Sequence, residues 1–429
     1  MRITFRSCVV VLAAILISSS ISTLAQDSVT LTFWKASHGE TQADWDALLQ
    51  PFEEATGINV EVVSHPWEGW DERYVTAFIG GTAPDVSYMP DEFWPRFAAA
   101  GQLTDMSALF ANELEAMAAD YPANLWELGT YEGKRFGIPY LFVAVQLFYN
   151  RDLFDAAGIE YPPSSPNDPN FADWTWERFA EVAQQLTQDT DGDGETDQWG
   201  FAWSVLFRDP NFLYPFLWQA GADILDVPNN TNGFGNERGA AAFTFIRELI
   251  DAGVIPDGGL NPNFQQVFYE GKAAMAPVES YSIATVRRDF PELNIGAAMT
   301  PQGPGIDFYD GRGSFGNAGF WVIAEASEHK AEAFQLIQYL NRPDNLTSMM
   351  DIIKLFGARV DWQPPTDEPL FQAFIEGQPY LVPYPLHPRL RQVHSLIIAE
   401  AQAMVLGEKS PEQAIMDAAA MVDELLAQP

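Results

Sequence analysis

Three short apolar segments alternate with two segments of helical spacing near the start of the chain, and this alternation constrains the fold most. The apolar segments cover residues 31–34, 58–63 and 85–89, as short buried strands would. The helical segments cover residues 44–56 and 71–79, and a glycine closes each of them within two residues. This β-α-β-α-β order predicts an α/β fold with a doubly wound, mostly parallel sheet.

Each predicted strand leads into a loop that carries aromatic or charged side chains. In open α/β sheets, ligands bind beyond the carboxyl ends of the strands. The segment that contains the third strand is the most informative. Gly80-Gly81 ends the preceding helix, and Pro84 prevents that helix from continuing. Asp91 then lies in the loop that follows the buried strand. We therefore expect Asp91 to contact a polar ligand, although a turn or a helix N-cap would also account for an aspartate there.

The rest of the chain continues the mixture of helices and strands. A mature chain of about 400 residues is too long for one core and predicts two lobes. A glycine-rich loop is predicted over residues 311–319, before a strand at 320–323. Further helices are predicted at 176–187, 212–220, 240–252, 264–270, 330–340 and 411–426, and further strands at 272–275 and 294–299.

Residues 1–25 have the pattern of a secretory signal peptide. Arg2 and Arg6 precede a short apolar stretch at residues 9–17, and small residues precede a cleavage point after Ala25. The chain's single cysteine, Cys8, lies before the apolar stretch and not at the cleavage point. The sequence therefore predicts export to the periplasm or the cell exterior without a lipid anchor, and a mature chain without disulfides.

The charge of the chain excludes several classes of partner. The formal net charge is −36, so nucleic acid and anionic membrane surfaces would repel the protein. Nothing after the signal peptide resembles a transmembrane helix. We expect a soluble exported monomer with no stable membrane insertion.

Several short motifs follow one another in a fixed order along the chain. They include Phe52-Glu-Glu-Ala-Thr-Gly-Ile58, Gly80-Gly-Thr-Ala-Pro-Asp-Val86, Tyr131-Glu-Gly-Lys-Arg-Phe-Gly-Ile-Pro139, Phe148-Tyr-Asn-Arg-Asp-Leu-Phe154 and Gly271-Lys-Ala-Ala-Met275. In their order and spacing, these motifs resemble those of extracellular solute-binding proteins of sugar ABC importers, of the maltose-binding-like type. The resemblance covers nearly the whole mature chain.

The resemblance implies two α/β lobes, each a mostly parallel sheet flanked by helices, joined by a multi-segment hinge and without catalytic activity. The ligand would be a sugar or oligosaccharide captured between the lobes, and the partner would be the membrane permease of an ABC importer. The implied N-terminal lobe is 26–142 and 295–341, the implied C-terminal lobe is 143–294 and 342–429, and crossings are expected near Val143, Ile295 and Asn341.

The resemblance also implies the site residues. It maps a first-lobe polar contact onto Asp91 and a second-lobe stacking aromatic onto Tyr281. Trp34 could equally be a core residue, and His38 a polar loop residue. The remaining candidates lie in segments that contact ligand in the family: Trp34, Ser37, His38, Trp67, Glu279, Ser280, Gly316, Asn317, Trp218, Phe207 and Arg359. One departure is that residues 141–145 lack the acid found in many maltodextrin-binding members, which argues against maltose.

Residues 189–197 partly match the pattern of a calcium-binding loop. Asp189, Asp191, Asp193 and Asp197 match positions 1, 3, 5 and 9 of a calcium loop, but position 12 is Gly200 and not glutamate. An acidic turn explains the same residues. Any bound calcium would be structural. We expect no other cofactor, because the five histidines are not clustered for a transition metal.

Two alternative functions remain open at this stage. A secreted carbohydrate-active enzyme would need a pair of carboxylates at a fixed separation. The same fold could also present a ligand to a sensor or bind a non-sugar solute such as a polyol phosphate, which would favour a cluster of Arg and Lys at the cleft.

Overall fold

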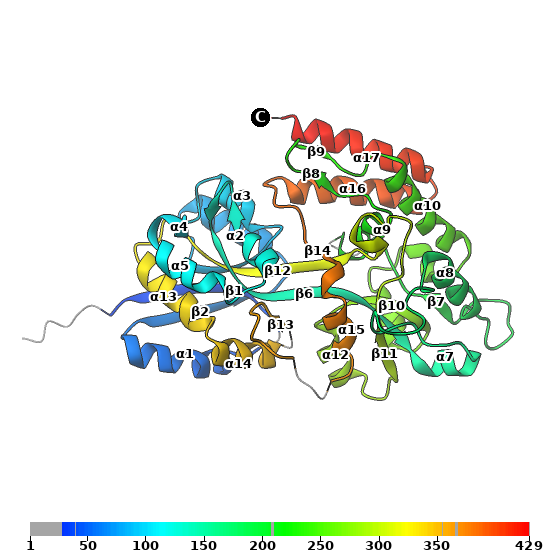
Figure 1. The fold of residues 1–429 in the computed structure, drawn as a ribbon, viewed down its shortest axis with the longest axis horizontal. Coiled ribbons are helices and arrows are strands. Elements are labelled where there is room, and N and C mark those ends of the chain that lie inside the picture. The colour runs from blue at the N-terminus through cyan, green and yellow to red at the C-terminus, as the bar shows by residue number, and fades with distance from the viewer. Residues whose placement is uncertain (1–27, 39, 207–209, 354, 365–367, 429) are drawn as a thin grey trace, which may run out of the picture.

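The molecule is built on a ten-stranded sheet that runs through two lobes (Figure 1). The computed structural model describes residues 28–38, 40–206, 210–353, 355–364 and 368–428, so the predicted signal peptide and Phe207 lie outside the described residues. The main path of the sheet has the order β2-β1-β3-β12-β6-β10-β7, and β11, β13 and β14 (Leu381–Val382) pair beside it. This confirms the predicted two-lobe α/β fold.

The first lobe begins with the predicted β-α-β-α-β unit. β1 (Thr30–Ala36) pairs in parallel with both β2 (Asn59–His65) and β3 (Val86–Pro90). A capping box between Thr41 and Asp44 starts the first helix, and Gly57 ends it with a φ of 73°. The helices of this lobe are α1 (Gln42–Thr56), α2 (Trp70–Gly80), α3 (Trp94–Ala99), α4 (Met106–Leu109), α5 (Ala111–Ala118), α6 (Ala123–Glu127), α13 (Lys330–Leu340) and α14 (Pro343–Ile353).

The second lobe surrounds β10 (Ala273–Glu279), which is antiparallel to β6 (Gly137–Asn150) and parallel to β7 (Trp199–Phe201). The chain returns to this lobe near its end, where two helices pack together at the top of the molecule in Figure 1. Its helices are α7 (Arg151–Ala157), α8 (Trp176–Gln185), η1 (Pro210–Phe212), α9 (Tyr214–Gln219), α10 (Glu237–Asp251), η2 (Pro256–Gly259), α11 (Phe264–Tyr269), α12 (Ser282–Asp289), η3 (Tyr309–Gly311), α15 (Phe371–Glu376), η4 (Gln378–Tyr380), α16 (Leu390–Val405) and α17 (Pro411–Leu426).

Two long antiparallel strands, β6 and β12 (Ser314–Ile323), connect the lobes. The predicted glycine-rich loop at 311–319 is therefore wrong for most of its length. Its glycines are needed because neighbouring strands approach closely: a Cβ on Gly316 would lie 2.7 Å from the Cβ of Leu381, and one on Gly319 would lie 2.7 Å from the ring of Tyr88. We call β6 and β12 the crossing strands.

The buried side chains form two clusters that divide the chain differently from the predicted segments. Residues of β11 (Ile295–Ala298) lie in the core of the second lobe, because this strand pairs with β6 at residues 147–150. Residues of α14 lie in the core of the first lobe. In β6 the change of lobe falls between Leu141 and Phe142, next to the crossing predicted near Val143. The other two changes fall within β12 and after β13 (Phe356–Gly357), whereas the sequence predicted them near Ile295 and Asn341.

Helix boundaries agree well with the sequence where the apolar spacing is long, as in α13 and α17. The sequence pattern did not predict α16, at residues 390–405. Within the described residues, no helix combines the length and the apolar character that crossing a membrane requires.

Candidate ligand-binding cleft

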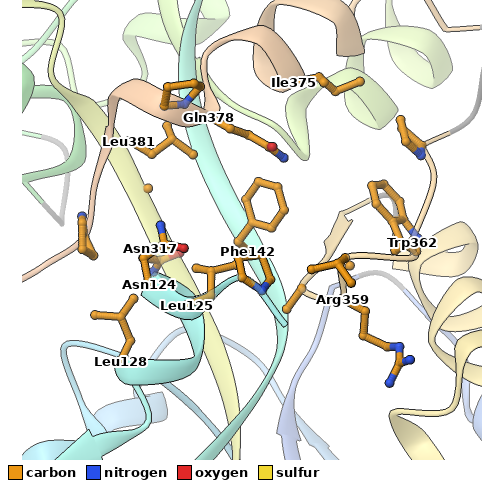
Figure 2. A pocket seen from close by; sticks show the side chains of 18 of the residues that line it. Asn124, Leu125, Leu128, Phe142, Asn317, Arg359, Trp362, Ile375, Gln378 and Leu381 are labelled. Atoms are coloured by element: carbon orange, nitrogen blue, oxygen red, sulfur yellow. The ribbon is translucent and has the colours of Figure 1, made fainter. Parts of the chain in front are cut away.

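A cleft of about 500 Å³ lies between the lobes, on one face of the crossing strands. We call it the front cleft. Val143 and Asn317 of the crossing strands contribute to its lining, and the two lobes supply its opposite walls. A second pocket, of about 460 Å³, includes Phe142, Gly316 and Arg359 in its lining, and we call it the rear pocket (Figure 2).

The first-lobe wall of the front cleft is made by residues at the ends of the three parallel strands, as the strand-end rule predicts. Ser37 and His38 follow β1, Trp67 follows β2, and Tyr88 and Glu92 lie in and just after β3. The ring of His38 meets the edges of Trp67 and Tyr88 at centroid distances of 5.5 and 5.6 Å. These packed rings give a rigid, largely aromatic surface.

A buried polar cluster behind this wall fixes the loop after β1. Lys35 pairs with Glu40, and its Nζ also donates to the carbonyl of Ala36 (3.0 Å) and to Oγ of Ser64 (2.9 Å). Glu40 in turn accepts the backbone N–H of His38 at 2.8 Å. Burial, and then the nearby charge of Lys35, lower the pKa of His38 to about 3, so its imidazole is neutral at physiological pH.

The second-lobe wall is organised by hydrogen bonds instead of ring packing. Glu279, at the end of β10, accepts the side-chain N–H of Asn211 at 2.6 Å and the hydroxyl of Tyr281 on its other oxygen. The Tyr384 hydroxyl donates to Oδ1 of Asn211 at 2.5 Å, which fixes the orientation of that amide. Ala284, Thr285 and Arg288 of α12 complete this wall. Arg288 is paired with Asp289 at 2.8 Å.

A smaller extension of the cleft, about 230 Å³, contains an ion pair between the lobes. Trp67, Pro90 and Glu92 line both the front cleft and this extension. Arg391 of α16 binds Asp71 of α2 at 2.5 Å there. The two lobes are therefore already in contact beside the cleft.

Six of the predicted site residues come together in the front cleft: Ser37, His38, Trp67, Glu279, Tyr281 and Asn317. Of these, Tyr281 is 38% exposed, which leaves much of its ring accessible to a ligand. These six come from four separate stretches of sequence and from both lobes.

The structure places Asp91 away from the cleft surface, which corrects the first site prediction. Its side chain is fully buried, and Oδ2 accepts the backbone N–H of Ala318 at 3.3 Å. Burial, together with the neighbouring charge of Glu92, holds the pKa of Asp91 well above its usual range. The adjacent residue, Glu92, lines the cleft. The strand-end rule located this turn correctly, but it could not tell which of two successive acids points outward.

Other predicted site residues also lie elsewhere. Trp34 packs against the rings of His65 and Tyr74, at 4.6 and 5.6 Å. Trp218 and Ser280 are fully buried, and Gly316 and Arg359 line the rear pocket. The position of a large aromatic residue near the end of a strand is therefore not enough to identify it as a ligand contact.

The polar and aromatic cleft residues that the sequence did not predict are Tyr88, Glu92, Asn211, Thr285 and Arg288. Alternation along β3 could have found Tyr88, because successive residues of a strand face opposite ways. Asn211 has no such signal, since it lies in a short 3₁₀ helix, η1, far in sequence from Glu279.

The predicted calcium loop has a compact cluster of carboxylates. Oxygens of Asp189, Asp191 and Asp197 lie within 4.8 Å of one another. Asp189 accepts the backbone N–H of Gly194 at 2.8 Å, as an acidic turn would arrange without any ion. Calcium binding at this loop stays a prediction.

Comparisons with known proteins bear on the family and the fold of the chain. A family model described as "Bacterial extracellular solute-binding protein" matches residues 35–346. The sn-glycerol-3-phosphate-binding periplasmic protein of Salmonella typhimurium is 22% identical, with 92% of each chain covered.

Solved structures show the same fold. An ABC transporter solute-binding protein from Thermotoga lettingae, bound with alpha-D-tagatose, has a TM-score of 0.77 at 24% identity and covers 93% of this chain and all of its own. The GacH receptor of Streptomyces glaucescens, solved unliganded and with acarbose, has a TM-score of 0.78 at 22% identity and covers 93% and 98%.

Proposed function

The chain belongs to the bacterial extracellular solute-binding protein family, and on that premise we propose that it captures a sugar or short oligosaccharide for an ABC importer. The observation that carries the proposal is the front cleft itself. One wall offers aromatic faces and the other offers a carboxylate and amides held in fixed directions. Aromatic faces cover the C–H faces of a sugar ring, while carboxylates and amides accept and donate hydrogen bonds to its hydroxyls.

A neutral ligand fits this cleft better than an anionic one. Glu92 and Glu279 stand on opposite walls, and Arg288, the cleft's cationic residue among those described, is paired with Asp289. A phosphate or carboxylate ligand would require unpaired cations at the site. The charges therefore favour a sugar over a polyol phosphate, even though one relative is named for glycerol phosphate.

Capture would proceed by closure of the lobes about the crossing strands. A ligand that contacts Trp67 on one wall and Glu279 on the other stabilises the state in which both contacts exist. The closed protein would then meet the membrane permease as a monomer, after export by the signal peptide. The proposal includes no catalytic step, because the family and the fold serve binding.

A calorimetric and thermal-shift screen of monosaccharides and oligosaccharides tests the function. A bound sugar raises the melting temperature by mass action, and calorimetry gives its dissociation constant. We expect at least one sugar to bind with 1:1 stoichiometry and to be recovered unchanged. Failure of every sugar, with binding of an anionic solute instead, would reject a sugar ligand. Release of a cleaved product would favour the enzyme alternative.

A further inference from the structure

The rear pocket lies behind the front cleft, on the opposite face of the crossing strands, and Asn317 is the residue that lines both. Phe142 and Val143 are neighbours in β6, and successive side chains of a strand point to opposite faces of the sheet. Phe142 lines the rear pocket and Val143 lines the front cleft. The volume of the rear pocket, about 460 Å³, is similar to that of the front cleft and within the range of small-molecule sites.

The walls of the rear pocket come from both lobes. Leu125 and Leu128 belong to α6 and the turn after it in the first lobe, and Ile375 and Leu381 belong to α15 and β14 in the second. Phe142 lies between these two pairs on a crossing strand (Figure 2). Any rotation of one lobe against the other about the crossing strands must therefore change the width of this pocket.

The lining of the rear pocket is apolar and partly aromatic, with a few neutral polar groups. The ring of Phe142 stacks on that of Phe356 with centroids 4.9 Å apart. The ring of Trp362 meets the Phe356 ring edge-on, with centroids 5.8 Å apart. Side-chain amides of Asn317 and Gln378 also line it. Figure 2 shows the Trp362 ring beside the opening that Phe142 and Gln378 border.

The lining also lacks an available charge among the described residues. Arg359 is its one ionic side chain there, and the guanidinium binds Asp120 at 2.9 Å and Asp361 at 2.8 Å. In Figure 2 this guanidinium points away from the pocket. An ionic ligand would lose its hydration here without gaining a counter-ion, so the lining selects a neutral molecule.

We propose that the rear pocket is a second ligand site, which takes a neutral, flat, largely apolar molecule carrying one or two hydrogen-bonding groups, and that its occupation holds the front cleft closed. Opening the front cleft separates Arg391 from Asp71 and moves the first lobe toward α15 and β14 at the rear. A molecule that fills the rear pocket at its present width opposes that movement. The coupling between occupation of the rear pocket and closure of the front cleft rests on the lobe closure proposed above. Binding in the rear pocket does not depend on that proposal.

Nile red, a neutral flat dye whose fluorescence rises in apolar surroundings, is the probe for the first test. We expect saturable 1:1 binding to the whole mature protein. Trp362→Ala, which removes one wall, and Leu128→Trp, which fills the space, should each weaken binding about tenfold or more. Melting temperatures of both variants check that they are folded. The anionic dye anilinonaphthalene sulfonate should not displace Nile red.

Trp67→Ala is the matched control, because it removes a tryptophan from the front cleft and should leave Nile red binding unchanged. Binding that is lost in Trp67→Ala but kept in both rear-pocket variants would overturn the proposal, because the dye would then occupy the front cleft. Absence of saturable binding would overturn it as well.

The coupling is tested by titrating the best sugar with and without saturating Nile red. We expect the sugar to bind about fivefold tighter with the dye present, and the dye to bind tighter by the same factor with sugar present. Competition between the two would overturn the coupling. If no sugar binds, the dye titration still decides whether the rear pocket is a ligand site. Failure of the proposed sugar-binding function can therefore be told apart from failure of the rear-pocket proposal.

Discussion

The two walls of the front cleft achieve rigidity by different means. The first-lobe wall is held by edge-to-face packing of His38, Trp67 and Tyr88, which depends on shape and on the exclusion of water. The second-lobe wall is held by directional hydrogen bonds that end on Glu279. Packing tolerates small changes of chemistry, whereas a buried hydrogen-bond chain leaves unsatisfied groups when one member is removed. The difference predicts which substitutions weaken binding most.

The largest loss is expected from Glu279→Ala. The variant removes an acceptor for the ligand and leaves the Asn211 amide and the Tyr281 hydroxyl without their partner, so affinity should fall about 100-fold, equivalent to about 2–3 kcal/mol. Calorimetry with the best sugar measures it. Glu270→Ala, at the surface-exposed end of α11, is the control and should bind normally. An unchanged affinity in Glu279→Ala would contradict the assigned role of the second-lobe wall.

The neutral imidazole of the first-lobe wall predicts a dependence on pH. The pKa of His38 is lowered to about 3 in the folded state, against an ordinary value of 6.5 when unfolded. Between these values the unfolded chain binds more protons, so this residue's contribution to stability is full above pH 6.5 and falls as the pH drops toward 3.

The variant His38→Asn isolates that contribution. We expect wild type to lose about 1–2 kcal/mol more stability than the variant on going from pH 7 to pH 5. Urea unfolding at a series of pH values measures the difference. Asp91 contributes an opposite pH dependence, because its raised pKa favours the folded state at low pH. This contribution is the same in both proteins, so it cancels when the unfolding free energy of the variant is subtracted from that of the wild type. Parallel curves for the two proteins would show that His38 is not desolvated.

Two tryptophans, one within β1 and one just after the neighbouring strand β2, sharpen the comparison further. Trp67→Ala should weaken sugar binding about tenfold, or about 1–1.5 kcal/mol, because the ligand loses an aromatic face. Trp34→Ala is the matched control: its ring packs on His65 and Tyr74 away from the cleft, so it should lower stability and leave affinity nearly unchanged. The reverse result would restore Trp34 as the ligand contact that the sequence predicted.

The fold and the first-lobe wall of the front cleft could be predicted from the sequence more readily than the second-lobe wall. The parallel strands at 30–36, 59–65 and 86–90 carry strong local patterns, and their ends necessarily meet at one edge of a sheet. The site residues predicted there, Ser37, His38 and Trp67, do line the cleft. Asp91 and Glu92 show the limit of such reasoning, because side-chain direction in a turn depends on tertiary contacts.

The second-lobe wall is assembled from segments that are distant in sequence. Asn211 and Tyr384 are 173 residues apart, and their contact depends on the chain returning to this lobe after leaving it. The glycines of β12 predicted a loop in place of a strand for a related reason. Glycine is typical of loops, but Gly316 and Gly319 lie in a strand where neighbouring side chains approach too closely for a Cβ.

The smallest expected effect tests whether the hydrogen-bond chain acts on the ligand through its most distant member. Tyr384→Phe removes the donor to Oδ1 of Asn211 and keeps the ring that packs on His394 at 4.7 Å. The Asn211 amide is then free to flip, which would present Oδ1 to the carboxylate of Glu279 for part of the time. We expect a loss of about 1 kcal/mol in stability and a severalfold loss in sugar affinity, measured by urea unfolding and calorimetry.

Tyr339→Phe separates these two effects, because Tyr339 donates an equivalent hydrogen bond to the carbonyl of Leu48 in the first lobe at 2.8 Å. It should lose similar stability and keep full affinity. If both variants keep full affinity, the Tyr384 hydroxyl stabilises the fold without orienting the binding groups. If only Tyr384→Phe loses affinity, the second-lobe wall depends on a residue outside the cleft, whereas the packed rings of the first-lobe wall need no such support.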